Sequence, residues 1–249
     1  GRVAGRLGRL RRRVQERIRG RRQRRRNRRE CRTTRNPTFI ATGVPVHTDP
    51  TFSLAGLLPI ELGAVWYGNI ADAGPLGPGR MTAFDATIRR NDAGGFVFLD
   101  DDGFPITFPA PTPIPEGWVE GDTVRAAWLM QAERRRLVFR EHGLFQTFAK
   151  YPDGVWRIIR IADRYDNALI LTRNSVGMLQ KIETPEGLVL HFDYDAQGLR
   201  REVRLEGEDG RQVTVMRYAY EGDQLILADA PYGERHEFSY DAKGQMVSC

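Results

Sequence analysis

The side chains best suited to bind metals are few and scattered in this sequence. The four histidines lie far apart, without metal-ligand spacing: His47, His142, His191 and His236. A zinc site needs several donors that converge on one ion, so these histidines predict none. Asp100-Asp101-Asp102 offers carboxylates for calcium but lacks the spaced oxygen ligands of a dedicated loop. We interpret it as the solvated turn of a hairpin.

Motifs for phosphate binding and nucleophilic catalysis are also missing from the sequence. The string Gly-Pro-Leu-Gly-Pro-Gly at residues 74–79 lacks the Gly-Lys-Ser/Thr ending of a phosphate loop. There is no Gly-x-Ser-x-Gly elbow and no paired Cys–His signature. Cys31 and Cys249 are the only cysteines, too few for a disulfide framework or a four-cysteine zinc site.

Two carboxylates recur in one repeated phrase. Residues 192–198 are Phe-Asp-Tyr-Asp-Ala-Gln-Gly, and residues 238–244 are Phe-Ser-Tyr-Asp-Ala-Lys-Gly. Asp195 and Asp241 therefore occupy equivalent places. A catalytic acid is usually a single residue, so the recurrence indicates a structural role. We predict no catalytic, cofactor-binding or metal-binding residues, no cofactor, and no enzymatic activity.

Regularly spaced glycines predict the turns that hold these residues. One set is spaced by 23, 21, 24 and 22 residues: Gly154, Gly177, Gly198, Gly222 and Gly244. A second set is spaced by 23 and 23: Gly187, Gly210 and Gly233. Turns therefore come about every 11 residues, with strands between them. Glycine adopts the positive φ of hairpin turns without a Cβ clash. A preceding Asp, as in Asp153 and Asp209, can accept turn amides.

The segments between the turns alternate as half-buried strands do. In residues 188–194 the large apolar side chains share one parity, and His191 and Asp193 occupy the other. Residues 96–99 and 104–108 flank an Asp-Gly turn and predict a hairpin. The apolar stretch 52–70 contains Pro59 and Glu61, which favours a buried strand–turn–strand over a transmembrane helix.

Charge divides the chain into a basic arm and an acidic body. Residues 1–36 contain 17 Arg against Glu16 and Glu30, a balance of +15, so a net charge of +6 leaves −9 for the rest. Five apolar residues share one face of a predicted helix: Val3, Leu7, Leu10, Val14 and Ile18. The helix is expected to give way to a flexible basic segment at residues 21–29. Such an arm suits intramolecular or partner docking, a solvated linker, nucleic acid or acidic lipid.

The ends of the sequence suggest a piece of a longer chain. It begins at Gly1 instead of Met, and Cys249 falls inside a repeat. The arginine-rich start has no continuous apolar stretch, so no secretory signal is readable.

The repeated phrases resemble the YD repeat, a Tyr-Asp-x-x-Gly unit of bacterial Rhs proteins and related polymorphic toxins. Weaker echoes stand at Arg164-Tyr165-Asp166 and at residues 174–179, and Glu221 replaces the Asp after Tyr220. The preceding region resembles the segment before the repeats in Rhs proteins. Its ordered phrases are residues 36–38, 41–43, 52–59, 66–67 and 74–79. It departs from the family at Ala55, where Pro is commoner, and at Arg80, where Trp or Tyr is commoner.

The resemblance implies an all-β fold, a spiral of antiparallel strands forming part of a hollow, cocoon-like shell. We expect a basic arm at residues 1–35, an Rhs N-terminal β region at 36–121 and a YD-repeat sheet at 122–249. The implied function is a structural fragment of a shell that encloses and helps deliver a C-terminal toxin. Partners would be the rest of the shell, the toxin, and a secretion spike, adaptor or chaperone bound through residues 1–36. The protein would start in the bacterial cytoplasm and then be secreted, by type VI secretion, or delivered to a target cell. The alternative is a nucleic-acid-binding protein that uses the arm, with a carbohydrate-binding β module as a minor alternative.

Overall fold

Strands account for all regular structure in the part of the chain that the computed structural model describes. It describes residues 45–49, 52–68, 73–99, 105–109, 119–120, 126–131, 134–139, 143–231 and 233–248. The predicted basic helix and flexible segment, His142, the aspartates 100–102 and both cysteines lie outside these residues. The all-β prediction is confirmed.

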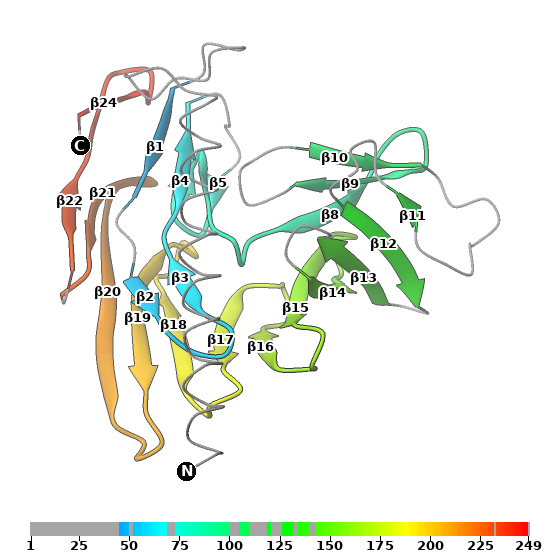
Figure 1. The fold of residues 1–249 in the computed structure, drawn as a ribbon. Coiled ribbons are helices and arrows are strands. Elements are labelled where there is room, and N and C mark those ends of the chain that lie inside the picture. The colour runs from blue at the N-terminus through cyan, green and yellow to red at the C-terminus, as the bar shows by residue number, and fades with distance from the viewer. Residues whose placement is uncertain are drawn as a thin grey trace.

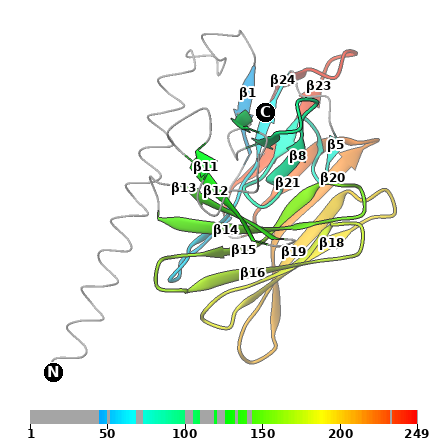
Figure 2. The same cartoon turned by 90° about the vertical axis from the view of Figure 1, so that its right-hand side faces the viewer.

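One long antiparallel sheet organises the fold. Twelve strands follow one another through it in sequence order. They are β11 (Val119–Glu120), β12 (Ala126–Gln131), β13 (Arg134–Phe139), β14 (Leu144–Lys150), β15 (Trp156–Ala162), β16 (Ala168–Arg173), β17 (Leu179–Glu183), β18 (Val189–Tyr194), β19 (Arg200–Glu206), β20 (Gln212–Glu221), β21 (Gln224–Asp229) and β22 (Arg235–Glu237). The sheet runs in Figure 1 from β12–β14 on the right to β20–β22 on the left. Figure 2 shows β14–β16 at an angle to β18–β20, as sheet twist requires.

The N-terminal strands form small antiparallel units. A three-stranded sheet contains β1 (Val46–Thr48), β4 (Val65–Tyr67) and β7 (Arg80–Met81). The pairs are β2 (Phe52–Leu54) with β3 (Ile60–Leu62), β5 (Ala73–Gly74) with β6 (Gly77–Pro78), and, near the C-terminus, β23 (Ser239–Tyr240) with β24 (Met246–Ser248). The predicted strand–turn–strand is therefore present at residues 52–62. Within the described residues, no helix is long and apolar enough to span a membrane.

A further hairpin joins the N-terminal region to the long sheet. β9 (Phe96–Leu99) pairs with β10 (Pro105–Phe108), as the Asp-Gly turn predicted. β8 (Thr87–Arg90) pairs with β9 on one side and with β15 on the other. One hydrophobic core contains Ile60 and Phe98 together with Phe148 and Leu190. Residues on both sides of the expected domain boundary at residue 121 thus pack into one core. The division into two domains at that residue stays a prediction.

The repeated aspartate begins a turn that glycine completes. The Gly198 amide donates to the Asp195 carbonyl at 3.1 Å, and Asp195 Oδ1 accepts the amides of Gln197 and Leu199 at 3.0 and 2.9 Å. Gly198 has a φ of +84°, a backbone conformation that would be strained for a residue with a side chain. The turn at Asp241 repeats this pattern. Asp153 and Asp209 each accept one turn amide, as predicted.

One expected echo of the repeat is out of register. Asp163, not Asp166, accepts the turn amides of Tyr165 and Asn167. Asp166 takes the place of the glycine with φ +67°, which Asp tolerates better than most residues. Tyr165 is 68% exposed and does not pack between strands. The Tyr165-Asp166 match was therefore wrong, whereas the echo at residues 174–179 is in register.

Candidate functional site

The tyrosines of the two repeated phrases, Tyr194 and Tyr240, each tie their strand to an earlier one. Tyr194 donates its hydroxyl to the carbonyl of Leu179 at 2.6 Å, 15 residues back. Tyr240 donates to the carbonyl of Leu225 at 2.7 Å, again 15 residues back. The repeat therefore couples a turn-forming Asp to a strand-tethering Tyr.

Arg173 supplies the same tether without a tyrosine. It precedes Asn174, which accepts turn amides as Asp195 does. Arg173 Nε donates to the carbonyl of Ile158 at 2.9 Å, also 15 residues back. A guanidinium thus replaces the phenol in one unit, and the contact spans 15 residues in three units. In the unit of Tyr220 the hydroxyl donates to the carbonyl of Arg200, 20 residues back.

The N-terminal strands meet the repeat sheet along an interface that we call the seam. It joins residues 45–90 to residues 173–245, and the left part of Figure 1 shows β1, β3 and β4 against β17–β22. Hydrogen bonds cross it at Leu57–Glu186, Phe84–Arg173, Pro75–Arg200 and Gly68–Gln245. The glycine string belongs to this interface. A Cβ on Gly77 would lie 2.3 Å from the carbonyl oxygen of Asp223, so only glycine fits.

A buried arginine stands at the centre of the seam. Arg80 Nε lies 2.8 Å from Asp49 Oδ2, and both residues are buried. Arg80 Nη1 donates to the hydroxyl of Tyr240 at 2.7 Å, and its guanidinium carbon lies 4.6 Å from the ring centroid of Phe238. A chain of contacts thus runs from Asp49 through Arg80 to a repeat tyrosine.

The Asp49–Arg80 pair is incompletely satisfied. Asp49 Oδ1 and Arg80 Nη2 are buried without a hydrogen-bond partner. Burial raises the pKa of Asp49, and Arg80 opposes that rise. A buried ion pair of this kind depends on both partners, because either charge alone would be costly to bury.

Two of the four histidines meet beside this pair. The ring centroids of His47 and His236 lie 5.9 Å apart, and those of His47 and Phe238 lie 5.7 Å apart. Burial, then His236 and Arg80, lower the pKa of His47 to about 4. Among the residues that the structure describes, no three His, Cys, Asp or Glu side chains are grouped to hold a metal ion.

Arg200 is a second buried cation in the seam. Its guanidinium carbon lies 4.9 Å from the ring centroid of Phe192, and Nη2 lies 3.6 Å from Asp85 Oδ1. Burial alone would lower the pKa of Arg200, but Asp85 and nearby tyrosines raise it above its usual value. Burial also raises the pKa of Tyr218 to about 12. Arg200 therefore stays charged in the core.

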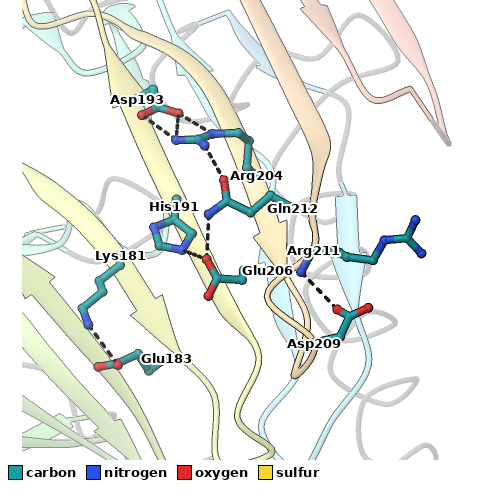
Figure 3. Close-up of polar contacts among 9 residues, drawn as sticks. All are labelled: Lys181, Glu183, His191, Asp193, Arg204, Glu206, Asp209, Arg211 and Gln212. Atoms are coloured by element: carbon teal, nitrogen blue, oxygen red, sulfur yellow. Dashed lines mark hydrogen bonds and ion pairs between the residues drawn. The ribbon is translucent and has the colours of Figure 1, made fainter.

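The opposite face of β17–β20 carries a polar ladder (Figure 3). Arg204 binds Asp193 with two contacts of 2.8 and 3.0 Å, and it donates to Gln212. Gln212 donates to Glu206 at 2.6 Å, and His191 Nε2 lies 2.9 Å from the same carboxylate. Gln212, then His191, lower the pKa of Glu206. These contacts use the side chains as cross-strand pairs, which stabilise a sheet.

The seam residues were largely missed in the sequence. Asp49, Asp85 and Arg200 carry no local signal, because their partners lie far along the chain. Arg80 did leave one: it stands after the glycine string, where the Rhs segments that this region resembles more often have Trp or Tyr. Its contacts with Phe238 and Tyr240 place it in an aromatic setting. Asp195 and Asp241 lie in turns, and His191 lies in the ladder, away from His47 and His236.

Comparison with known proteins gives one family match. Residues 35–108 match DUF6531, a domain of unknown function. The comparison with curated proteins gave no match. Solved structures similar to this chain include one from the crystal structure of TcdB2-TccC3-Cdc42, with 10% sequence identity and a TM-score of 0.48. The alignment covers 83% of this chain and 15% of that chain.

Proposed function

We propose that this chain is the opening part of an Rhs/YD-repeat shell that encloses a C-terminal toxin. The observation that carries the proposal is the repeated unit of turn and tether. Its Asp carboxylate accepts hydrogen bonds from turn amides, and its Tyr hydroxyl donates to a carbonyl 15 residues back. The polar groups of the motif are therefore occupied by contacts that build the sheet. Such units bury a continuous core by stacking on their neighbours.

The proposed role is mechanical and non-enzymatic. A strip of antiparallel strands can lengthen by adding units of the same kind, and curvature would let it surround a cargo. In this proposal the protein is made in the bacterial cytoplasm and exported by type VI secretion, then delivered to a target cell. Its partners would be the rest of the shell and the enclosed toxin.

Protease protection tests the enclosure. The full product of the gene would be digested under native conditions and again after partial unfolding in urea. We expect the region after the repeats to be protected in the native protein and cleaved once the shell opens. A variant without residues 45–108 should lose that protection. Equal cleavage with and without these residues, or a gene product without further repeats, would refute the proposal.

The basic arm is proposed to dock on a partner by charge, on a secretion spike, adaptor or chaperone. The 17 arginines of residues 1–36 favour an electrostatic contact. Replacing the arginines of residues 21–29 with glutamine should weaken binding strongly at low salt and little at high salt. Tight, salt-sensitive binding to random RNA would instead favour the nucleic-acid alternative.

A further inference from the structure

Two histidines from opposite sides of the seam share one apolar site. His47 lies on β1, and His236 lies on β22, the last strand of the long sheet. Both rings pack on Phe238, with centroids 5.7 and 6.2 Å from it. A proton added to either imidazole would enter a site built from aromatic rings and a second imidazole.

One cation and two carboxylates face this histidine pair. Arg80, on β7, binds Asp49, the residue that follows β1. Tyr240, on β23, is hydrogen-bonded to Arg80 and stays neutral at ordinary pH. Glu234 lies 3.7 Å from His236 Nε2, but its side chain is 77% exposed. A protonated His47 would therefore add a second cation beside Arg80, whereas the one buried carboxylate of the group, Asp49, already pairs with Arg80.

We propose that the seam is an acid-sensitive latch, closed while His47 is neutral beside His236 and weakened when His47 is protonated. Opening would release the strands of residues 45–81 from the last repeat. The proposal concerns this interface alone and holds whatever the chain encloses.

The direction follows from proton linkage. The pKa of His47 is about 4 in the closed site against 6.5 in its unperturbed form. The open state therefore binds more protons than the closed state below pH 6.5, so acid favours opening. These two values give a weakening of about 30-fold at most between pH 7.5 and pH 5. Asp49 acts in the opposite direction, because burial raises its pKa and the closed state takes up its proton first.

Hydrogen exchange of the full chain tests the latch. Amides of residues 46–49 and 233–240 would be followed between pH 7.5 and 5, corrected for the intrinsic pH dependence and compared with those of β18. We expect protection to fall by up to about 30-fold in the wild type, and to change little in His47→Gln. Because both proteins keep Asp49, its contribution cancels in the comparison. His191→Gln, on the opposite face, is the matched control and should behave as the wild type does.

A titration of the imidazoles by NMR keeps the test independent of variant folding. The His47 resonance of the wild type should titrate near pH 4. It should move to higher pH in His236→Gln, because one neighbouring imidazole is removed. A wild-type midpoint near 6.5, or the same exchange profile in the wild type and His47→Gln, would overturn the proposal.

Discussion

Removing the Arg80 guanidinium should be among the most destabilising single changes in the seam. Arg80→Met keeps an unbranched apolar side chain but leaves the Asp49 carboxylate, 4% exposed, without its counter-charge. The contacts with Tyr240 and Phe238 are also lost. Breaking a buried pair from one side costs about 3–5 kcal/mol. We expect the free energy of unfolding to fall by that amount.

The double variant separates the pair from its surroundings. Asp49→Leu alone should cost about 2–4 kcal/mol, less than Arg80→Met, because Arg80 keeps Tyr240 and Phe238. Asp49→Leu with Arg80→Met removes both charges and the two unpartnered polar atoms. It should lie within about 2 kcal/mol of the wild type. The coupling energy is then about 3 kcal/mol or more.

Urea unfolding followed by the fluorescence of the buried Trp66 and Trp156 would measure these differences. Arg157→Met is the matched control, because Arg157 pairs with Asp153, whose side chain is 46% exposed, and the variant should lose less than about 1 kcal/mol. In Arg80→Met, stability should also fall as pH rises above the ordinary carboxyl pKa of 3.8, since burial raises the pKa of Asp49 and the unpaired carboxylate must ionise. Additive effects of the two substitutions, or a cost for Arg80→Met no larger than the control, would refute the reasoning.

Three further outcomes can be checked in the same assay. Tyr194→Phe removes the hydrogen bond to Leu179 and should lower the free energy of unfolding by about 1 kcal/mol. Tyr165→Phe, at an exposed ring, should change it by less than about 0.5 kcal/mol. Equal effects of the two substitutions would contradict the tether. Gly77→Ala should cost more than about 2 kcal/mol, because its Cβ meets the Asp223 carbonyl and its φ is positive; a neutral result would mean that the β5–β6 turn is not held there. Arg157 lowers the pKa of Asp153 to about 2, so the pair stabilises the fold above pH 3.8 and loses this effect as pH falls toward 2; Asp153→Asn should flatten that part of the pH profile.

The repeat sheet was predictable because its signals are local. Each turn is specified by a few neighbouring residues, as with Asp195 and Gly198, and each strand by alternation between turns. The Tyr165-Asp166 error has a local cause too. The letters matched the motif, but the hydrogen bonds of the turn place Asp163 in the role of the repeat aspartate.

The seam was not predictable in the same way, because its pairs are formed by the tertiary fold. Arg80 and Tyr240 are 160 residues apart in the sequence, and no periodicity links them. His47 and His236 looked like isolated residues and prove to be neighbours. Arg80, an arginine among apolar and aromatic motifs, was the one signal in the sequence, and its partners could be identified only in the fold.

The tyrosine tethers and the contacts of the seam differ in how far apart their residues lie in the sequence, and this difference has a consequence for synthesis on the ribosome. A tether that spans 15 residues can form soon after its tyrosine emerges, so hairpins can be added one after another as the chain grows. The bond from Gln245 to the Gly68 carbonyl spans 177 residues, so it must wait for nearly all of the described chain. The apolar strands at residues 46–67 are therefore made first and completed last. Throughout that interval we expect the side of these strands that faces the repeat sheet to remain exposed.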